Sequence, residues 1–228
     1  MKEHDVEVGK LDYCQISGSK DLFEAIDLGF QPPCGTLLTE DKLRDPETYY
    51  SLRLMVCPES GLGQLDYVVG SEICFPEDYP YRPGISVPLR EHLERLADDV
   101  IKKNKLHPGD LVVDVGSNDG TLLSFFQEKG MKVLGVEPTN MAKVASADGI
   151  YTIQEFFNKE VAEDIVKKYG KAKAITFTNV FAHMADLGTV MDGVSVLLDD
   201  DGVVVSESQY LLDVFEGNQF DEVYHDHI

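Results

Sequence analysis

This 228-residue sequence has no uninterrupted apolar run of about 18 residues, the length that a membrane-spanning helix requires. Its first five residues, MKEHD, are too polar for a secretory signal peptide. Its four cysteines, at positions 14, 34, 57 and 74, are scattered and do not resemble a secreted disulfide scaffold. We therefore expect a cytoplasmic protein without a transmembrane helix.

Positive charge is also scarce, with 20 Lys and Arg against 41 Asp and Glu, for a formal net charge of −21. A surface of that sign repels phosphate backbones and anionic lipids, so we expect neither a nucleic-acid nor a membrane partner. Any anionic ligand must be met by local donors, because the field of the whole chain opposes it. Hydrophobic residues at 43% and charged residues at 27% are close to average for a folded protein and argue against wholesale disorder.

Two regions of the chain differ in amino-acid composition and in the pattern of their apolar residues. Residues 1–85 are rich in Gly, Pro, Tyr and Cys and hold short apolar runs at 52–56 and 65–69, which predicts a small, loop-rich, β-containing module. Residues 79–84, with the sequence YPYRPG, read as a connector. We place the second domain at residues 86–228.

Strands and helices alternate through the second region, after an amphipathic helical pattern that begins at Val87 and stops before Pro108. Expected strands are 111–115, 132–136, 150–153, 174–177 and 202–207, and expected helices are 122–128, 141–147, 161–169 and 187–198. Such alternation predicts a parallel sheet covered by helices on both faces. The predicted fold class is therefore α/β, with a Rossmann-like sheet.

The clearest local signal is a glycine turn after the first expected strand. The strand runs straight into Gly116-Ser117-Asn118-Asp119-Gly120, which opens the next helix. Glycines let a ligand approach the backbone, and ligands of open α/β sheets bind beyond the carboxyl ends of the strands. The second strand ends at Glu137, 23 residues after Asp114, where a carboxylate can accept hydrogen bonds from ribose hydroxyls. The candidate cofactor-binding residues are Asp114, Gly116, Ser117, Asn118, Gly120, Glu137 and, at the end of the fourth strand, Asn179.

The sequence of the turn distinguishes between a dinucleotide and S-adenosylmethionine as its ligand. Its glycines do not have the G-x-G-x-x-G spacing of a dinucleotide site, and Asp119 would oppose a pyrophosphate at the helix N-terminus. A cationic sulfonium meets no such penalty. The pattern resembles the first motif of class I methyltransferases, with Asn118 in place of a central glycine. We therefore predict S-adenosylmethionine rather than a dinucleotide or an empty turn.

Four ordered motifs extend this resemblance over essentially the whole chain. Residues 114–123, 135–138, 179–183 and 224–227 are together similar to the sugar C-methyltransferases. Members of that family use S-adenosylmethionine and act on 4-keto-deoxysugars carried on a nucleoside diphosphate. The resemblance implies a nucleotide-sugar substrate that is methylated beside its ketone through an enolate.

The resemblance also implies catalytic roles. His227 corresponds to the general base, which suits an imidazole because small pKa shifts bring it near neutrality. Tyr224 and His183 would orient the ketosugar or stabilise the enolate, and Asp226 stands where the family usually has a glutamate. A tyrosine of the connector is expected to face the sugar, and the sequence does not choose between Tyr79 and Tyr81.

The N-terminal module departs from the family, which usually carries zinc on two C-x-x-C pairs. Here serines replace the second cysteine of each pair, giving Cys14 with Ser17 and Cys57 with Ser60. Structural zinc sites use four Cys or His ligands, and a hydroxyl is a poor ligand. Cys34 and Cys74 do not have the spacing to substitute. We predict no tightly bound zinc.

The end of the sequence departs as well, because the family continues beyond Ile228 with further strands and a second nucleotide-binding-like domain. The sequence therefore predicts an incomplete sheet, in a fragment or in half of a protein that a second chain completes. One alternative is a non-catalytic S-adenosylmethionine-binding scaffold. Another is a methyltransferase acting on an oxygen or nitrogen of a different small molecule. Such an acceptor needs no carbon-acid base, so His227 favours C-methylation.

Overall fold

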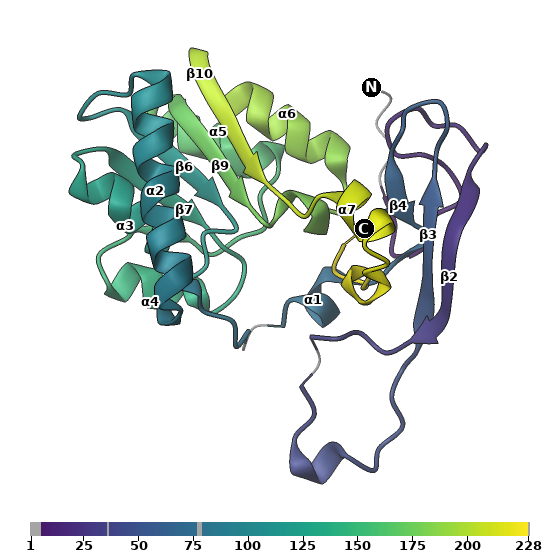
Figure 1. The fold of residues 1–228 in the computed structure, drawn as a ribbon. Helices are drawn as coiled ribbons and strands as arrows, with labels where there is room; N and C mark the ends of the chain where they lie inside the picture. The colour runs from purple at the N-terminus through teal and green to yellow at the C-terminus, as the bar shows by residue number, and fades with distance from the viewer. Residues whose placement is uncertain (1–5, 36, 77–78, 228) are drawn as a thin grey trace. The chain divides into compact units, whose positions relative to one another are not determined.

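The computed structural model describes residues 6–35, 37–76 and 79–227 (Figure 1). The chain forms two compact units. Unit 1 comprises residues 1–76, 182–188 and 209–228, and unit 2 comprises residues 77–181 and 189–208. Two segments of the region that follows residue 85 therefore cluster with the N-terminal module. Within the described residues, no helix is both long and apolar enough to cross a membrane.

Unit 2 is built on a five-stranded parallel sheet with the strand order β10-β9-β6-β7-β8. Its strands are β6 (Leu111–Val115), β7 (Lys132–Val136), β8 (Thr152–Ile153), β9 (Ala172–Thr178) and β10 (Leu198–Glu207). All five residues of β6 are buried, as its nearly continuous apolar sequence predicts for a central strand covered on both faces. The prediction of an α/β fold with a parallel sheet is confirmed.

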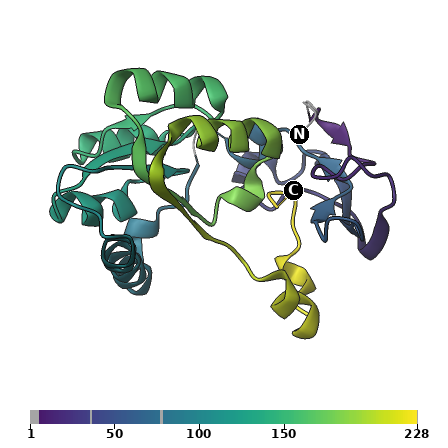
Figure 2. The same cartoon turned by 90° about the horizontal axis from the view of Figure 1, so that it is seen from above.

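Helices cover both faces of this sheet. They are α2 (Val87–Asn104), α3 (Thr121–Glu128), α4 (Met141–Ala147), α5 (Lys159–Tyr169) and α6 (Leu187–Leu197). Figure 2 shows α5 and α6 on one side of the sheet and α2 on the other. The apolar stripe of α2, including Leu93 and Val100, belongs to one buried cluster with Phe126 of α3 and Val112 of β6. Packing of this kind holds the carboxyl ends of the strands in a fixed arrangement.

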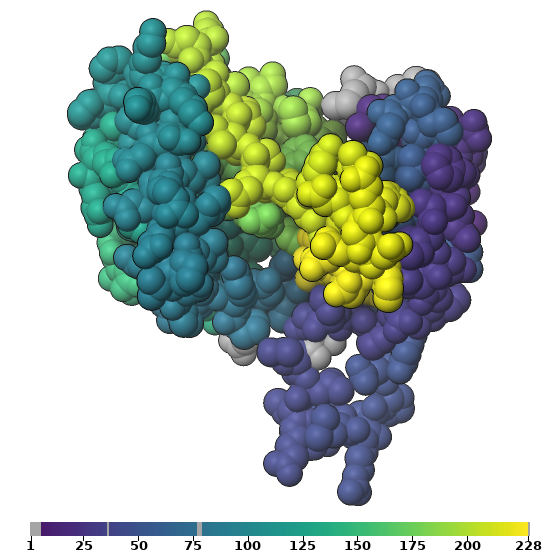
Figure 3. All heavy atoms as spheres, viewed as in Figure 1, coloured from purple at the N-terminus to yellow at the C-terminus, as the bar shows by residue number. Residues whose placement is uncertain are grey.

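Unit 1 contains small antiparallel sheets, as the texture of its sequence predicts. Strands β2 (Phe23–Gln31), β3 (Tyr50–Val56) and β4 (Gly63–Leu65) form one sheet, and β1 (Gly9–Lys10) pairs with β5 (Tyr67–Val68). Short helices complete the unit: α1 (Ser71–Cys74), α7 (Leu211–Glu216) and the 3-10 turns Glu40–Lys42, Phe181–His183 and Phe220–Glu222. Residues 37–49, between β2 and β3, are all exposed and protrude from unit 1 (Figure 3).

Candidate functional site

The glycine turn after β6 has a backbone that few residues other than glycine can adopt. Gly116, Asn118 and Gly120 all have positive φ values, of 70°, 48° and 77°. Asparagine tolerates this left-handed region better than most side chains, which explains how Asn118 can replace a glycine. A Cβ atom on Gly116 would lie 2.5 Å from Cγ2 of Val180. The turn therefore requires glycine at position 116 on two independent grounds.

Glu137, which follows β7, lies against this turn. Its carboxylate is 95% buried and accepts a hydrogen bond from the backbone N–H of Asn118 at 3.1 Å through Oε2. Its other oxygen, Oε1, accepts from the backbone N–H and the hydroxyl of Thr139, at 2.9 and 2.6 Å. These bonds fix the carboxylate beside the backbone of the turn.

Two further polar side chains, those of Asp114 and Ser117, come from the end of β6 and from the turn itself. The Thr176 hydroxyl donates to Oδ1 of Asp114 at 2.5 Å, which joins β9 to β6. Burial, reinforced by the charge of Glu137, raises the pKa of Asp114 to about 7. The Ser117 hydroxyl is buried and has no hydrogen-bond partner among the described residues. Ser117 therefore offers a polar group that a ligand can satisfy.

The connector, residues 79–84, contacts the glycine turn through the side chain of Asp119. The backbone N–H of Gly84 donates to Oδ2 of Asp119 at 3.1 Å, and Nε of Arg82 lies 3.8 Å from the same oxygen. Burial, and then the charge of Asp119, raise the pKa of Tyr81, which is 54% exposed. Tyr79 is half-buried. Tyr81 is therefore close enough to the turn for the charge of Asp119 to act on its hydroxyl.

Asn179 lies at the carboxyl end of the sheet, just after β9. Its backbone N–H donates to the carbonyl of Glu207 at 2.7 Å, and its Nδ2 donates to Oε1 of the same residue at 3.3 Å. Nε2 of His92, from α2, lies 2.6 Å from Oε2 of Glu207. Sequence reasoning missed Glu207 and His92. The sequence did hold a signal for Glu207, because this residue, like Glu137, lies at the carboxyl end of an expected parallel strand.

The predicted catalytic residues of unit 1 form a stack of rings. The ring centroids of Tyr224 and His227 are 4.1 Å apart, and those of His227 and His183 are 4.9 Å apart. Phe75 packs edge-on against His183, with 5.2 Å between centroids. The structure therefore brings together three residues from two distant motifs and adds Phe75, which the sequence did not single out.

Hydrogen bonding and burial set the states of the two histidines. Nδ1 of His183 lies 2.7 Å from the backbone carbonyl oxygen of Asp226. A carbonyl only accepts, so Nδ1 carries a hydrogen and Nε2 holds the lone pair when the ring is neutral. Burial, and then the neighbouring His183, lower the pKa of His227 to about 4. At neutral pH, His227 is an uncharged imidazole that can accept a proton.

The Asp226 side chain has a different neighbour. Its carboxyl is hydrogen-bonded to the Cys74 thiol, burial raises the pKa of Asp226, and burial with the nearby Asp226 raises that of Cys74 to about 12. The adjacent His225 is 99% buried and donates from Nε2 to the carbonyl of Tyr50 at 3.4 Å. Asp226 therefore contacts His183 through its backbone, while His225 anchors the segment to β3.

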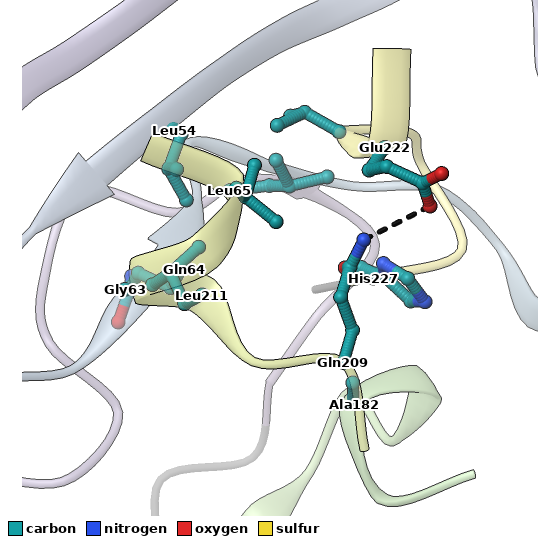
Figure 4. A pocket seen from close by; sticks show the side chains of 11 residues that line it. Leu54, Gly63, Gln64, Leu65, Ala182, Gln209, Leu211, Glu222 and His227 are labelled. Atoms are coloured by element: carbon teal, nitrogen blue, oxygen red, sulfur yellow. Dashed lines mark hydrogen bonds between the residues drawn. The ribbon is translucent and has the colours of Figure 1, made fainter. Parts of the chain in front are cut away.

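A cavity of about 170 Å³ lies beside His227 in unit 1 (Figure 4). Its wall is mainly apolar and comes from β3, β4, the turn Phe181–His183 and the C-terminal segment: Leu54, Gly63, Gln64, Leu65, Ala182, Gln209, Leu211, Val214, Glu222, Val223 and His227. Nε2 of Gln209 donates to Oε2 of Glu222 at 2.9 Å across this wall. The cavity is smaller than the roughly 300 to 1,000 Å³ that is typical of small-molecule sites, so we assign it no ligand.

Four side chains occupy the positions where the family carries its zinc-binding cysteines. They converge, but two of them are serines, and this set of ligands does not fit zinc. Sγ of Cys14 lies 3.1 Å from Oγ of Ser60, and Oγ of Ser17 lies 3.5 Å from Sγ of Cys57. Within the described part of the chain, no group of three or more His, Cys, Asp or Glu side chains is arranged to hold a metal. Two thiols and two hydroxyls fall short of the four Cys or His ligands of a structural zinc site.

The sheet order, the glycine turn and the acidic residue after the second strand together define a class I methyltransferase domain. Residues 89–228 match the protein family described as "Methyltransferase domain", and residues 14–75 match the family described as "Putative zinc binding domain". The chain belongs to the methyltransferase domain family. The prediction of a methyltransferase domain is thereby confirmed.

A curated relative supports the predicted resemblance to C-methyltransferases. The C-methyltransferase NovU of Streptomyces niveus is 34% identical over 221 residues, which is 96% of this chain and 52% of the relative. The chain thus spans about half the length of that relative. Among solved structures, DesVI of Streptomyces venezuelae is 19% identical, with a TM-score of 0.41 and coverage of 53% of this chain and 51% of that one. An S-adenosylmethionine-dependent methyltransferase from Archaeoglobus fulgidus is 17% identical, with a TM-score of 0.48 and coverage of 60% and 61%.

Proposed function

We propose that this chain carries the cofactor-binding and proton-abstracting parts of a C-methyltransferase. Its acceptor is a nucleoside-diphosphate-linked 4-keto-deoxysugar, methylated on the carbon beside the ketone. The observation that carries this proposal is the ring stack of Tyr224, His227 and His183, because a carbon acceptor needs a nearby base to remove a proton from its C–H bond. The similarity to a C-methyltransferase supports the same reaction type.

His227 takes the proton from the carbon beside the ketone, and the electron pair of the broken C–H bond passes into an enolate. When bound, S-adenosylmethionine supplies an electrophilic methyl group on a sulfonium. The enolate carbon would take that methyl group as the C–S bond breaks, S-adenosylhomocysteine would leave, and His227 would hold the abstracted proton. No further reactant is required.

Hydrogen bonding and burial support different roles for Tyr224 and His183. Burial raises the pKa of Tyr224 to about 12, so its hydroxyl keeps its hydrogen and can donate to the enolate oxygen. His183 donates its Nδ1 hydrogen to the Asp226 carbonyl, so its Nε2 can accept a hydrogen bond when the ring is neutral. We assign enolate stabilisation to Tyr224 and orientation of a sugar hydroxyl to His183.

The residues around the glycine turn suit S-adenosylmethionine. Glu137 would accept hydrogen bonds from the ribose hydroxyls, and the buried Ser117 hydroxyl would gain the partner that it lacks. Gly116 and Gly120 allow the left-handed backbone of the turn, where a Cβ atom would meet Val180 or Ile150. Asp114 and Asn179 would hold the ends of β6 and β9 around the cofactor.

Solvent exchange tests the base without requiring methyl transfer. A thymidine-diphosphate 4-keto-deoxysugar in deuterium oxide is expected to gain deuterium beside the ketone when the protein is added. His227→Gln should slow this exchange by about a hundredfold or more, because general-base catalysis contributes about 10² to 10⁴. The matched control is His107→Gln, at an exposed histidine that should leave the rate unchanged.

The outcomes distinguish two functions. Exchange that His227→Gln leaves unchanged would contradict the role of His227. S-adenosylhomocysteine binding by a folded chain that catalyses no exchange would instead support the non-catalytic cofactor-binding scaffold.

A further inference from the structure

Two turns of unit 1 are built alike. In the first, the N–H of Gly18 donates to the carbonyl of Cys14 at 2.8 Å, and in the second the N–H of Gly61 donates to that of Cys57 at 2.8 Å. Both glycines are left-handed, with φ values of 71° and 75°. Each cysteine N–H donates to the carbonyl five residues further along, at 2.8 Å for the first turn and 2.9 Å for the second. The backbone of each turn is therefore closed by its own hydrogen bonds.

The two serines occupy equivalent places in these turns. Oγ of Ser17 accepts from the N–H of Ser19 at 3.3 Å, and Oγ of Ser60 accepts from the N–H of Leu62 at 3.1 Å. Each hydroxyl hydrogen remains available to donate elsewhere. Each serine oxygen also lies within hydrogen-bond distance of the cysteine sulfur of the opposite turn, Ser17 of Cys57 and Ser60 of Cys14, and either atom of each pair can donate.

The four side chains thus converge on one centre from two related turns. Both cysteines are fully buried, whereas the serines are exposed residues at the surface of the unit. A thiol and a hydroxyl can each donate or accept, so each cysteine–serine pair links the two turns whichever atom donates.

We propose that these two turns form a metal-free brace, in which reciprocal thiol–hydroxyl hydrogen bonds replace a structural zinc ion. Each turn is closed by its own backbone hydrogen bonds and therefore keeps its shape without a metal. The two turns then hold four side chains in the arrangement of a four-thiolate site, with serine oxygens at two of the four sulfur positions. Replacing both serine oxygens by sulfur should therefore create a zinc site without further change. This inference does not depend on the proposed enzymatic reaction.

The test compares the full chain with the double variant Ser17→Cys/Ser60→Cys, each expressed with zinc and passed over a chelating resin. The wild-type chain is expected to retain no zinc by elemental analysis and to unfold at the same temperature with and without a chelator. The double variant should retain about one zinc per chain and lose thermal stability when the chelator is added.

The matched control is Ile16→Cys/Glu59→Cys, which adds the same number of thiols to the same turns at exposed neighbouring positions. It should retain no zinc. One equivalent of zinc on the wild-type chain would overturn the metal-free brace. A folded Ser17→Cys/Ser60→Cys variant without zinc would overturn the retained geometry.

Single variants keep the test decisive if the double variant does not fold. Ser17→Cys and Ser60→Cys each give three thiols and one hydroxyl, and should bind cobalt(II) with a thiolate charge-transfer absorption that the control variant lacks. Absence of that absorption in both folded single variants would contradict the proposal. Circular dichroism establishes that each variant is folded.

Discussion

His183 donates a hydrogen bond from Nδ1 to the backbone carbonyl of Asp226, with 2.7 Å between the two heavy atoms. This bond joins the segment after β9 to the C-terminal motif and fixes which nitrogen of His183 carries the hydrogen. Nε2 of His183 is left as an acceptor beside the ring of His227. The protonation of His227 is therefore linked to a neighbour whose orientation the backbone determines.

The first prediction concerns the titration of His227. Burial and the nearby His183 lower its pKa to about 4, so its imidazole should remain uncharged from neutral pH down to about pH 5. Histidine ring signals followed by NMR against pH measure this directly. The exposed His107 serves as an internal comparison in the same spectra.

Replacing His183 extends this prediction. His183→Gln should raise the pKa of His227, because one of the two causes of its depression is lost. A wild-type His227 that titrates together with His107 would show that it is not held as the structure describes.

A second prediction concerns the backbone of the turn. Gly116→Ala should destabilise the protein by about 1 to 3 kcal/mol and abolish cofactor binding, because alanine is strained at a φ of 70° and its Cβ would meet Val180. Gly149→Ala is the matched control, since Gly149 also has a positive φ, of 91°, but has open space around its Cβ position. Urea unfolding measures both variants. Equal losses would show that contact with Val180 adds nothing.

A third prediction follows from the buried carboxyl of Asp114. Its folded pKa of about 7 lies above its usual value of 3.8, so the folded state holds a proton that the unfolded chain releases. This contribution to stability is fully present below about pH 4 and is lost as the pH rises through about 7. Asp114→Asn keeps the acceptor for Thr176 but removes the titration.

Urea unfolding from about pH 5 to about pH 8 tests this linkage. The wild-type chain should lose stability relative to Asp114→Asn as the pH rises across that range. Parallel profiles for the two proteins would contradict a raised pKa at Asp114.

The parallel sheet, the glycine turn and Glu137 could be predicted because their signals are local. Apolar runs mark buried parallel strands, and the turn lies next to the strand that it ends. Asn118 could be placed in the turn because asparagine tolerates the left-handed conformation that the turn needs.

The contacts among distant residues could not be predicted in this way. Phe75 packs on His183, and Asp226 turns its carboxyl toward Cys74, because tertiary packing brings three separate segments of unit 1 together. The pairing of His92 with Glu207 likewise joins a helix and a strand far apart in the sequence. Motif reading identifies residues of known type but does not give the direction in which a side chain points.

The central claim is that S-adenosylmethionine binds at the glycine turn with its ribose held by Glu137. Calorimetric titration with S-adenosylhomocysteine tests it, comparing the wild-type chain with Glu137→Gln and with Glu128→Gln, a matched change at an exposed position on α3. Loss of hydrogen bonds to a charged acceptor costs about 1.5 to 3 kcal/mol, so Glu137→Gln should weaken binding by about tenfold to a hundredfold, while Glu128→Gln should not change it. Wild-type protein that is folded and binds no S-adenosylhomocysteine, or a Glu137→Gln variant that binds it equally well, would contradict the claim.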